Sequence, residues 1–210
     1  MDVQNSRRTP CWPLLLLFFA SSSPALAATL AGFTFDSPSG EFVTEAATLD
    51  AAIDLAAWTD EQSKVTGFSG NPGRALATSR FQDGNRLILT LLSFSADLRL
   101  EQLLFDVRAS ASGPQDLLIE INDLAQASLN VTTSFISHSV DLTLLPDSTL
   151  SIAFRGLNAT SNAGTLRLDN VVIVGQVVPV PLPGMGLATA LSLASLGVWR
   201  RRPRPFAPAV

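Results

Sequence analysis

Apolar and polar residues alternate along most of the chain between residues 28 and 178. Successive side chains of a β-strand point to opposite faces of a sheet, so this period of two predicts strands with one buried face. The alternating sets are Ala31, Phe33 and Phe35; Leu103, Phe105 and Val107; Leu117, Ile119 and Ile121; Val140, Leu142 and Leu144; Leu150, Ile152 and Phe154; and Leu166 and Leu168 leading to Val174. The body of the chain is therefore expected to consist mainly of β-sheet.

Clusters of Gly, Pro, Asn, Asp and Ser separate these runs, at 37–40, 70–73, 83–85, 112–114, 146–148 and 162–164. Such residues favour turns, and strands that recur every 10 to 15 residues or so between polar turns predict an antiparallel β-sandwich. Residues 87–92 are nearly all apolar, which favours a central strand covered on both faces or a short buried helix. Residues 45–58 are the one stretch with helical spacing, through Leu49, Ile53 and Ala57.

The N-terminus has the order of a secretory signal peptide. Arg7 and Arg8 precede the apolar run 14–20, and small residues follow up to Ala25 and Ala27. We therefore expect signal peptidase to cut after Ala27, which would remove residues 1–27 together with Cys11, the only cysteine. The alternative, a buried N-terminal helix, requires polar residues at helical spacing, and residues 14–19 have none.

The C-terminus contains an uncharged run, 184–199, followed by a basic cluster formed by Arg200, Arg201, Arg202 and Arg204. A helix over this run would be about 24 Å long, slightly short of a hydrocarbon core of about 30 Å. The arginines would stay on the cytoplasmic side of the membrane. Both predicted ends then place the body, residues 28–178, outside the cytoplasm.

Just before this run lies the motif Val180, Pro181, Leu182 and Pro183. Together with the apolar run and the arginines, it resembles the VPLPA variant of the PEP-CTERM sorting signal, here residues 179–204 with a tail at 205–210. The resemblance implies transient anchoring in the inner membrane of a Gram-negative bacterium that makes exopolysaccharide. An exosortase, a membrane-embedded cysteine transpeptidase, would then cut near the motif and deliver the body to the cell surface or medium. Gly184 stands where the family has alanine, and an ordinary anchor that is never cut is the alternative.

The body is acidic. The two ends carry six of the 14 basic residues but only one of the 18 acidic residues, so the body has a net charge of −9. Phosphate recognition requires a basic face, so nucleic acid is not an expected partner.

The segments 140–143, 150–155 and 164–171, followed by Gly175, resemble the closing strands of jelly-roll domains of the galactose-binding or carbohydrate-module type. In such modules the first and last strands often supply a calcium site. The resemblance thus makes Asp36, Asp169 and Asn170 candidate calcium ligands, with acids that solvate turns as the alternative.

Trp58, with Phe68 nearby, is a candidate sugar-stacking platform, although core packing explains the same aromatic residues. His138 is the only histidine, no Gly-x-Ser-x-Gly motif occurs, and no pair of carboxylates is distinguished by its surroundings, so no catalytic residue is assigned and no enzyme is predicted. The sequence therefore favours an exported structural or adhesive surface protein delivered by exosortase-type sorting. The alternative is a carbohydrate-binding module that acts on exopolysaccharide, with or without calcium.

Overall fold

The computed structural model describes residues 27–61, 65–79, 81 and 84–180. These residues form strands, turns and loops, with no helix among them. The strands are β1 (Ala28–Phe33), β2 (Thr48–Leu49), β3 (Leu55–Asp60), β4 (Val65–Ser69), β5 (Arg74–Ser79), β6 (Arg86–Leu92), β7 (Ala96–Ala109), β8 (Asp116–Ile121), β9 (Leu124–Asn130), β10 (Ile136–Asp141), β11 (Thr149–Leu157) and β12 (Thr165–Pro179). The predicted all-β architecture is confirmed for this part of the chain.

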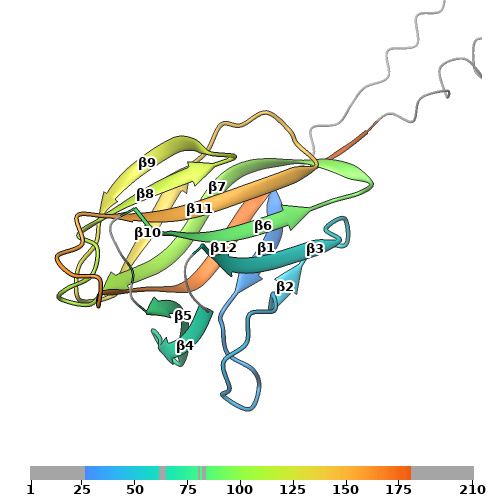
Figure 1. Cartoon of the computed structure of the whole chain (residues 1–210). Coiled ribbons are helices and arrows are strands. Elements are labelled where there is room, and N and C mark those ends of the chain that lie inside the picture. The colour runs from blue at the N-terminus through green and yellow to red at the C-terminus, as the bar shows by residue number, and fades with distance from the viewer. Residues whose placement is uncertain (1–26, 62–64, 80, 82–83, 181–210) are drawn as a thin grey trace, which may run out of the picture.

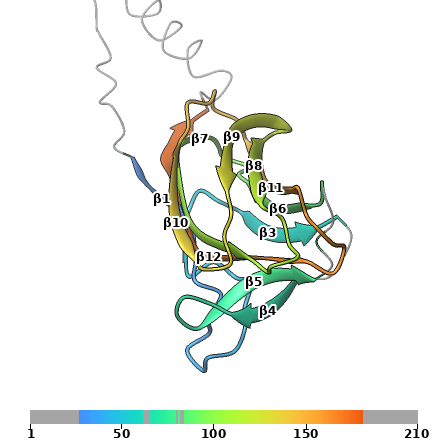
Figure 2. The same ribbon diagram turned by 90° about the vertical axis from the view of Figure 1, so that its left-hand side faces the viewer.

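The strands form two antiparallel sheets that face each other (Figure 1). The seven-stranded sheet has the order β10-β7-β12-β1-β2, and the hairpin β4–β5 joins it by pairing β5 with β12. The five-stranded sheet has the order β3-β6-β11-β8-β9. Figure 2 shows the two sheets side by side, with the β4–β5 hairpin below them. This arrangement is a β-sandwich.

Aromatic rings from both sheets meet between the layers. Trp58 of the five-stranded sheet lies edge-on to Phe33 at 5.4 Å and to Phe35 at 5.6 Å between ring centroids. Phe154, from the same sheet as Trp58, contacts Phe105 of the other sheet edge-on at 5.2 Å. Such pairs add about 0.5–1.5 kcal/mol each to the hydrophobic effect of burial. The core thus couples the two layers directly.

Strand β12 changes partner halfway along its length. Residues 165–168 pair with β5, and residues 171–175 pair with β1. Between these halves the register with β7 shifts between Asp169 and Val172, and Asn170 has a φ of 48°. A residue in the left-handed region at a register shift is a β-bulge, which bends the strand. The bend allows the β4–β5 hairpin to extend the sheet beside β12.

Residues 45–58 do not form the helix that their spacing allowed. Thr48 and Leu49 pair with β1, and β3 pairs with β6 over Leu55–Asp60. Ile53 is buried whereas Leu49 is 45% exposed, so the expected common face does not exist. Backbone groups here bond to neighbouring strands, and this pairing overrides a weak local preference for helix.

The apolar run 87–92 is a strand, as predicted, and β6 lies between β3 and β11. Its burial alternates, however, with Leu87, Leu89 and Leu91 in the core and the residues between them half-buried. The expectation of equal cover on both faces is therefore wrong, because only one face of this sheet meets the other layer.

The predicted features of the two ends lie almost wholly outside the described residues. This applies to Ala25, to Pro181, Leu182 and Pro183, and to the four arginines at 200–204. Within the part of the chain that the structure describes, no helix has the length and apolar character needed to cross a membrane.

Candidate functional site

Trp58 does not form a sugar-stacking platform. Its side chain is only 8% exposed and packs against Phe33, Phe35 and Phe154, so neither ring face is open to a ligand. Core packing, the alternative interpretation, is what the structure shows. Phe68 lies on β4 and is half-buried, in the other sheet. The two predicted platform residues therefore do not act together.

Phe68 instead belongs to a polar and aromatic surface on the outer face of the seven-stranded sheet. The guanidinium of Arg167 lies over the Phe68 ring at 4.8 Å, and that of Arg108 lies over Phe135 at 5.6 Å. Arg108 on β7 and Arg167 on β12 are directly opposite each other in the strand pairing. Their neighbours along each strand, such as Val107 and Leu168, point into the core, so the alternation of the strands turns both arginines outward.

The next row of the same face carries Asp106 and Asp169, which are also directly opposite each other. Asp106 accepts a short hydrogen bond from the Ser137 hydroxyl and a second, of 2.8 Å, from the Asn170 side-chain amide. Asp169 accepts hydrogen bonds from the backbone N–H groups of Asn71 and Asn170. We call the set Asp106, Arg108, Phe135, Ser137, Arg167, Asn170 and Phe68 the β7–β12 face, with Asp169 beneath it.

The β4–β5 turn covers Asp169 completely, leaving its side chain without solvent exposure. Burial raises the pKa of Asp169 to about 6, against the effect of the hydrogen bonds from Asn71 and Asn170. The negative charges of Asp36 and Asp106 also raise this pKa. Asp169 is thus a carboxylate whose ionisation the fold opposes near neutral pH.

The structure brings two of the predicted calcium ligands to one turn. The backbone N–H of Arg74 donates to Asp36 at 2.7 Å, and that of Asn71 donates to Asp169. The side-chain amide of Asn170, the third candidate, donates to Asp106 and to the carbonyl oxygen of Asn71. However, no group of three or more His, Cys, Asp or Glu side chains suited to a metal ion occurs among the described residues. Calcium binding remains a prediction supported by a shared turn and not by a formed coordination shell.

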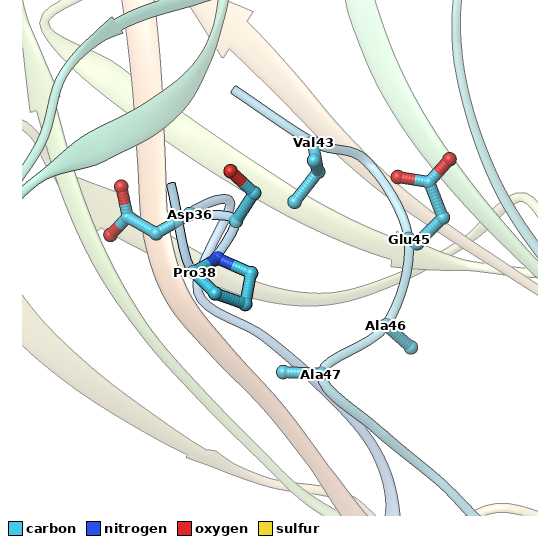
Figure 3. A pocket seen from close by; sticks show the side chains of 7 residues that line it. Asp36, Pro38, Val43, Glu45, Ala46 and Ala47 are labelled. Atoms are coloured by element: carbon cyan, nitrogen blue, oxygen red, sulfur yellow. The ribbon is translucent and has the colours of Figure 1, made fainter. Parts of the chain in front are cut away.

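Asp36 also borders a pocket of about 530 Å³ in the loop between β1 and β2 (Figure 3). Pro38 and Val43 line its middle, whereas the carboxylates of Asp36 and Glu45 point away from each other. A pair of acids used for glycoside hydrolysis would face a common cleft. The pocket therefore has no arrangement suited to that chemistry.

The outer face of the five-stranded sheet differs from the β7–β12 face because its arginines are already paired. Arg86 lies 2.6 Å from Glu61 and 2.5 Å from Asp123, and the hydrogen bond to Glu61, followed by that to Asp123, raises the pKa of Arg86. Arg155 lies 3.4 Å from Glu120. Within the described part of the chain, Arg108 and Arg167 form no ion pair, which leaves their charge available to a ligand.

His138 packs its ring against Phe105 at 5.6 Å, and burial lowers its pKa despite the nearby charge of Asp106. His138 is therefore a half-buried residue that packs against the core. The arginine pair, by contrast, was missed by sequence reasoning. Its only signal was the outward position of Arg108 and Arg167 in alternating runs, and their juxtaposition depends on the pairing of β7 with β12.

No family model and no curated protein matches the sequence. Among solved structures, the chain resembles the tandem CBM22-1–CBM22-2 domain of Xyn10C from Paenibacillus barcinonensis, at 18% identity and a TM-score of 0.50, over 79% of this chain and 50% of that one. The single xylan-binding CBM22-1 domain of the same protein aligns over 76% of this chain and all of that chain, at 17% identity and a TM-score of 0.48. A family 29 carbohydrate-binding module aligns at 14% identity and a TM-score of 0.40, over 71% and 91% of the two chains. The likeness to the tandem domain shows that the body shares the β-sandwich fold of that domain.

Proposed function

We propose that this protein is an exported carbohydrate-binding protein that holds a polysaccharide on its β7–β12 face. The observation that carries the proposal is a combination of side chains on one sheet face: two arginines that form no ion pair within the described part of the chain, two phenylalanines, and the polar groups Ser137 and Asn170. Sugar rings offer hydroxyl groups to such polar side chains and apolar C–H faces to aromatic ones. The fold shared with carbohydrate-binding modules supports the same function.

A comparison of two phenylalanines tests this proposal. The full exported chain is passed over immobilised xylan, cellulose, dextran and polygalacturonate, and the retained fraction is measured. Phe68→Ala should reduce retention on every polymer that binds, because it removes an apolar contact from the β7–β12 face. Phe94→Ala makes the same chemical change at an 80% exposed position beside Ala96, which pairs with Pro179 at the far end of β12.

Equal losses in the two variants would place the ligand elsewhere on the molecule. Absence of retention on all four polymers would contradict carbohydrate binding itself. The structural or adhesive surface protein predicted from the sequence would then be the better description.

The proposal includes delivery outside the cytoplasm by the predicted signal peptide and sorting signal. We expect the mature chain to begin at Ala28 and to lose the basic cluster 200–204, so its intact mass should report both cuts. Replacing Pro181 and Pro183 together by alanine should block the second cut without unfolding the body, because both residues follow the last strand. A double variant with the same mass and location as the wild type would favour an uncut anchor.

A further inference from the structure

We propose that the β7–β12 face recognises acidic sugars, with Arg108 and Arg167 binding the carboxylate of a uronic acid residue in the polysaccharide. This inference rests on the proposed function and specifies the class of its ligand. It starts from an unusual pairing, since like charges directly opposite each other across two strands destabilise a sheet.

The two guanidinium groups have few partners within the described part of the chain. Arg167 donates through one terminal nitrogen to the Ser69 hydroxyl at 3.0 Å and the Ser69 carbonyl at 3.4 Å. The Nε atoms of Arg108 and Arg167 are buried and have no hydrogen-bond partner among the residues that the structure describes. The remaining terminal N–H groups can meet a carboxylate, which guanidinium groups bind through parallel hydrogen bonds.

The phenylalanine rings hold this pair in place. Arg108 over Phe135 and Arg167 over Phe68 restrict the side chains to the sheet face. Burial lowers the pKa of Arg167, and the positive charge of Arg108 lowers it further. The two guanidinium groups therefore repel each other, and an anion bound between them would offset this repulsion. A pair of arginines held against aromatic rings is preorganised to bind an anion from outside.

The adjoining row favours a sugar over a simple anion. Ser137 is exposed and Asn170 is half-buried, and Asp106 orients both by accepting their hydrogen bonds. Hydroxyl groups of a sugar ring can bond to Ser137 and Asn170 while the carboxylate lies on the arginines. The net charge of −9 on the body opposes long-range attraction of an anionic polymer. At physiological salt, charges farther apart than about 8 Å are largely screened, so the distant acids of the body contribute little and the arginine pair supplies the attraction on this face.

The experiment compares one polymer with and without its charge. Binding of the full exported chain to polygalacturonate and to its carboxyl-reduced form is measured by affinity electrophoresis at pH 7.5. We expect the acidic polymer to bind at least about tenfold more tightly, because each charge-assisted hydrogen bond contributes more than a neutral one. Arg108→Gln and Arg167→Gln should each remove most of that preference.

Arg99→Gln is the matched control, because it removes the same charge from β7 at a site where Glu101 lies 2.9 Å away. It should leave the preference unchanged. Equal binding of the two polymers by the wild type would overturn the inference while leaving the proposed function intact, whereas binding of neither polymer, nor of xylan, cellulose or dextran, would contradict both. If one glutamine variant fails to fold, the other still tests the arginine pair, and the wild-type comparison of the two polymers still tests the preference for acidic sugars.

Discussion

The buried carboxylate of Asp169 should make the stability of the body depend on pH in a specific way. Its folded-state pKa of about 6 lies above the ordinary value of 3.8. Between these values the unfolded chain has released a proton that the folded chain retains, so folding stability falls as pH rises from about 4 to about 6. At 1.36 kcal/mol per pH unit, the loss is about 3 kcal/mol, complete above pH 6 and absent below pH 4.

Asp169→Asn removes this dependence, because an amide does not ionise. The amide retains a single acceptor oxygen for the two backbone N–H groups of Asn71 and Asn170, which costs about 1–3 kcal/mol at every pH. The variant should therefore be less stable than the wild type at pH 4 and gain about 3 kcal/mol relative to it by pH 7.5. The free energy of unfolding can be measured by urea titration, with the fluorescence of the buried Trp58 as the signal.

Asp97→Asn is the control, since it removes a negative charge from β7 at a half-buried position away from the β4–β5 turn. Its stability difference from the wild type should not change by 3 kcal/mol over the same range. Parallel curves for the Asp169→Asn variant and the wild type between pH 4 and pH 7.5 would refute the reasoning.

Three further predictions concern the core, the turn and the metal. Trp58→Ala should cost about 3–5 kcal/mol of stability, measured by denaturation, while the folded fraction still binds polysaccharide; a selective loss of binding would contradict its position in the core. Gly73→Ala should destabilise the body more than Gly40→Ala. The two glycines have similar φ values, 79° and 78°, so the backbone strain is the same, but only the methyl group at 73 would collide with the Asp36 carboxylate. Equal melting temperatures of the two variants would contradict this. If Asp36, Asp169 and Asn170 bind calcium, a hundredfold excess of the ion over its dissociation constant should add about 2.7 kcal/mol to the free energy of unfolding. The melting temperature should then rise by several degrees, and Asp169→Asn should abolish the rise. An unchanged wild-type melting temperature in millimolar calcium would remove that site.

The bend in β12 illustrates the limit of sequence patterns. The alternation through Leu166 and Leu168 predicts that Val174 is buried, whereas the structure buries Val171 and Ile173. The bulge at Asn170 shifts the face by one residue, because a residue in the left-handed region interrupts the alternation. Asparagine adopts this conformation more readily than most residues, yet nothing local required it to do so at this position.

The sequence determined the features that depend on local covalent geometry. Side chains alternate along a strand whatever its partner is, so the apolar periods at Leu117, Ile119 and Ile121 were sufficient to predict strands. At the N-terminus, basic residues, an apolar run and small residues follow one another in the order of a signal peptide. This order likewise supports the prediction of an exported chain without any reference to its fold.

Only the tertiary structure decided which side chains meet. Trp58 is buried because its strand pairs with β6 and turns that ring toward Phe33 and Phe154. Arg108 and Arg167 are neighbours because β7 pairs with β12 in one register, and a shift of one residue would have turned one of them inward. Strand pairing and register are set by the packing of the whole sandwich, and for that reason the candidate site could not be predicted from the local pattern that specified its strands.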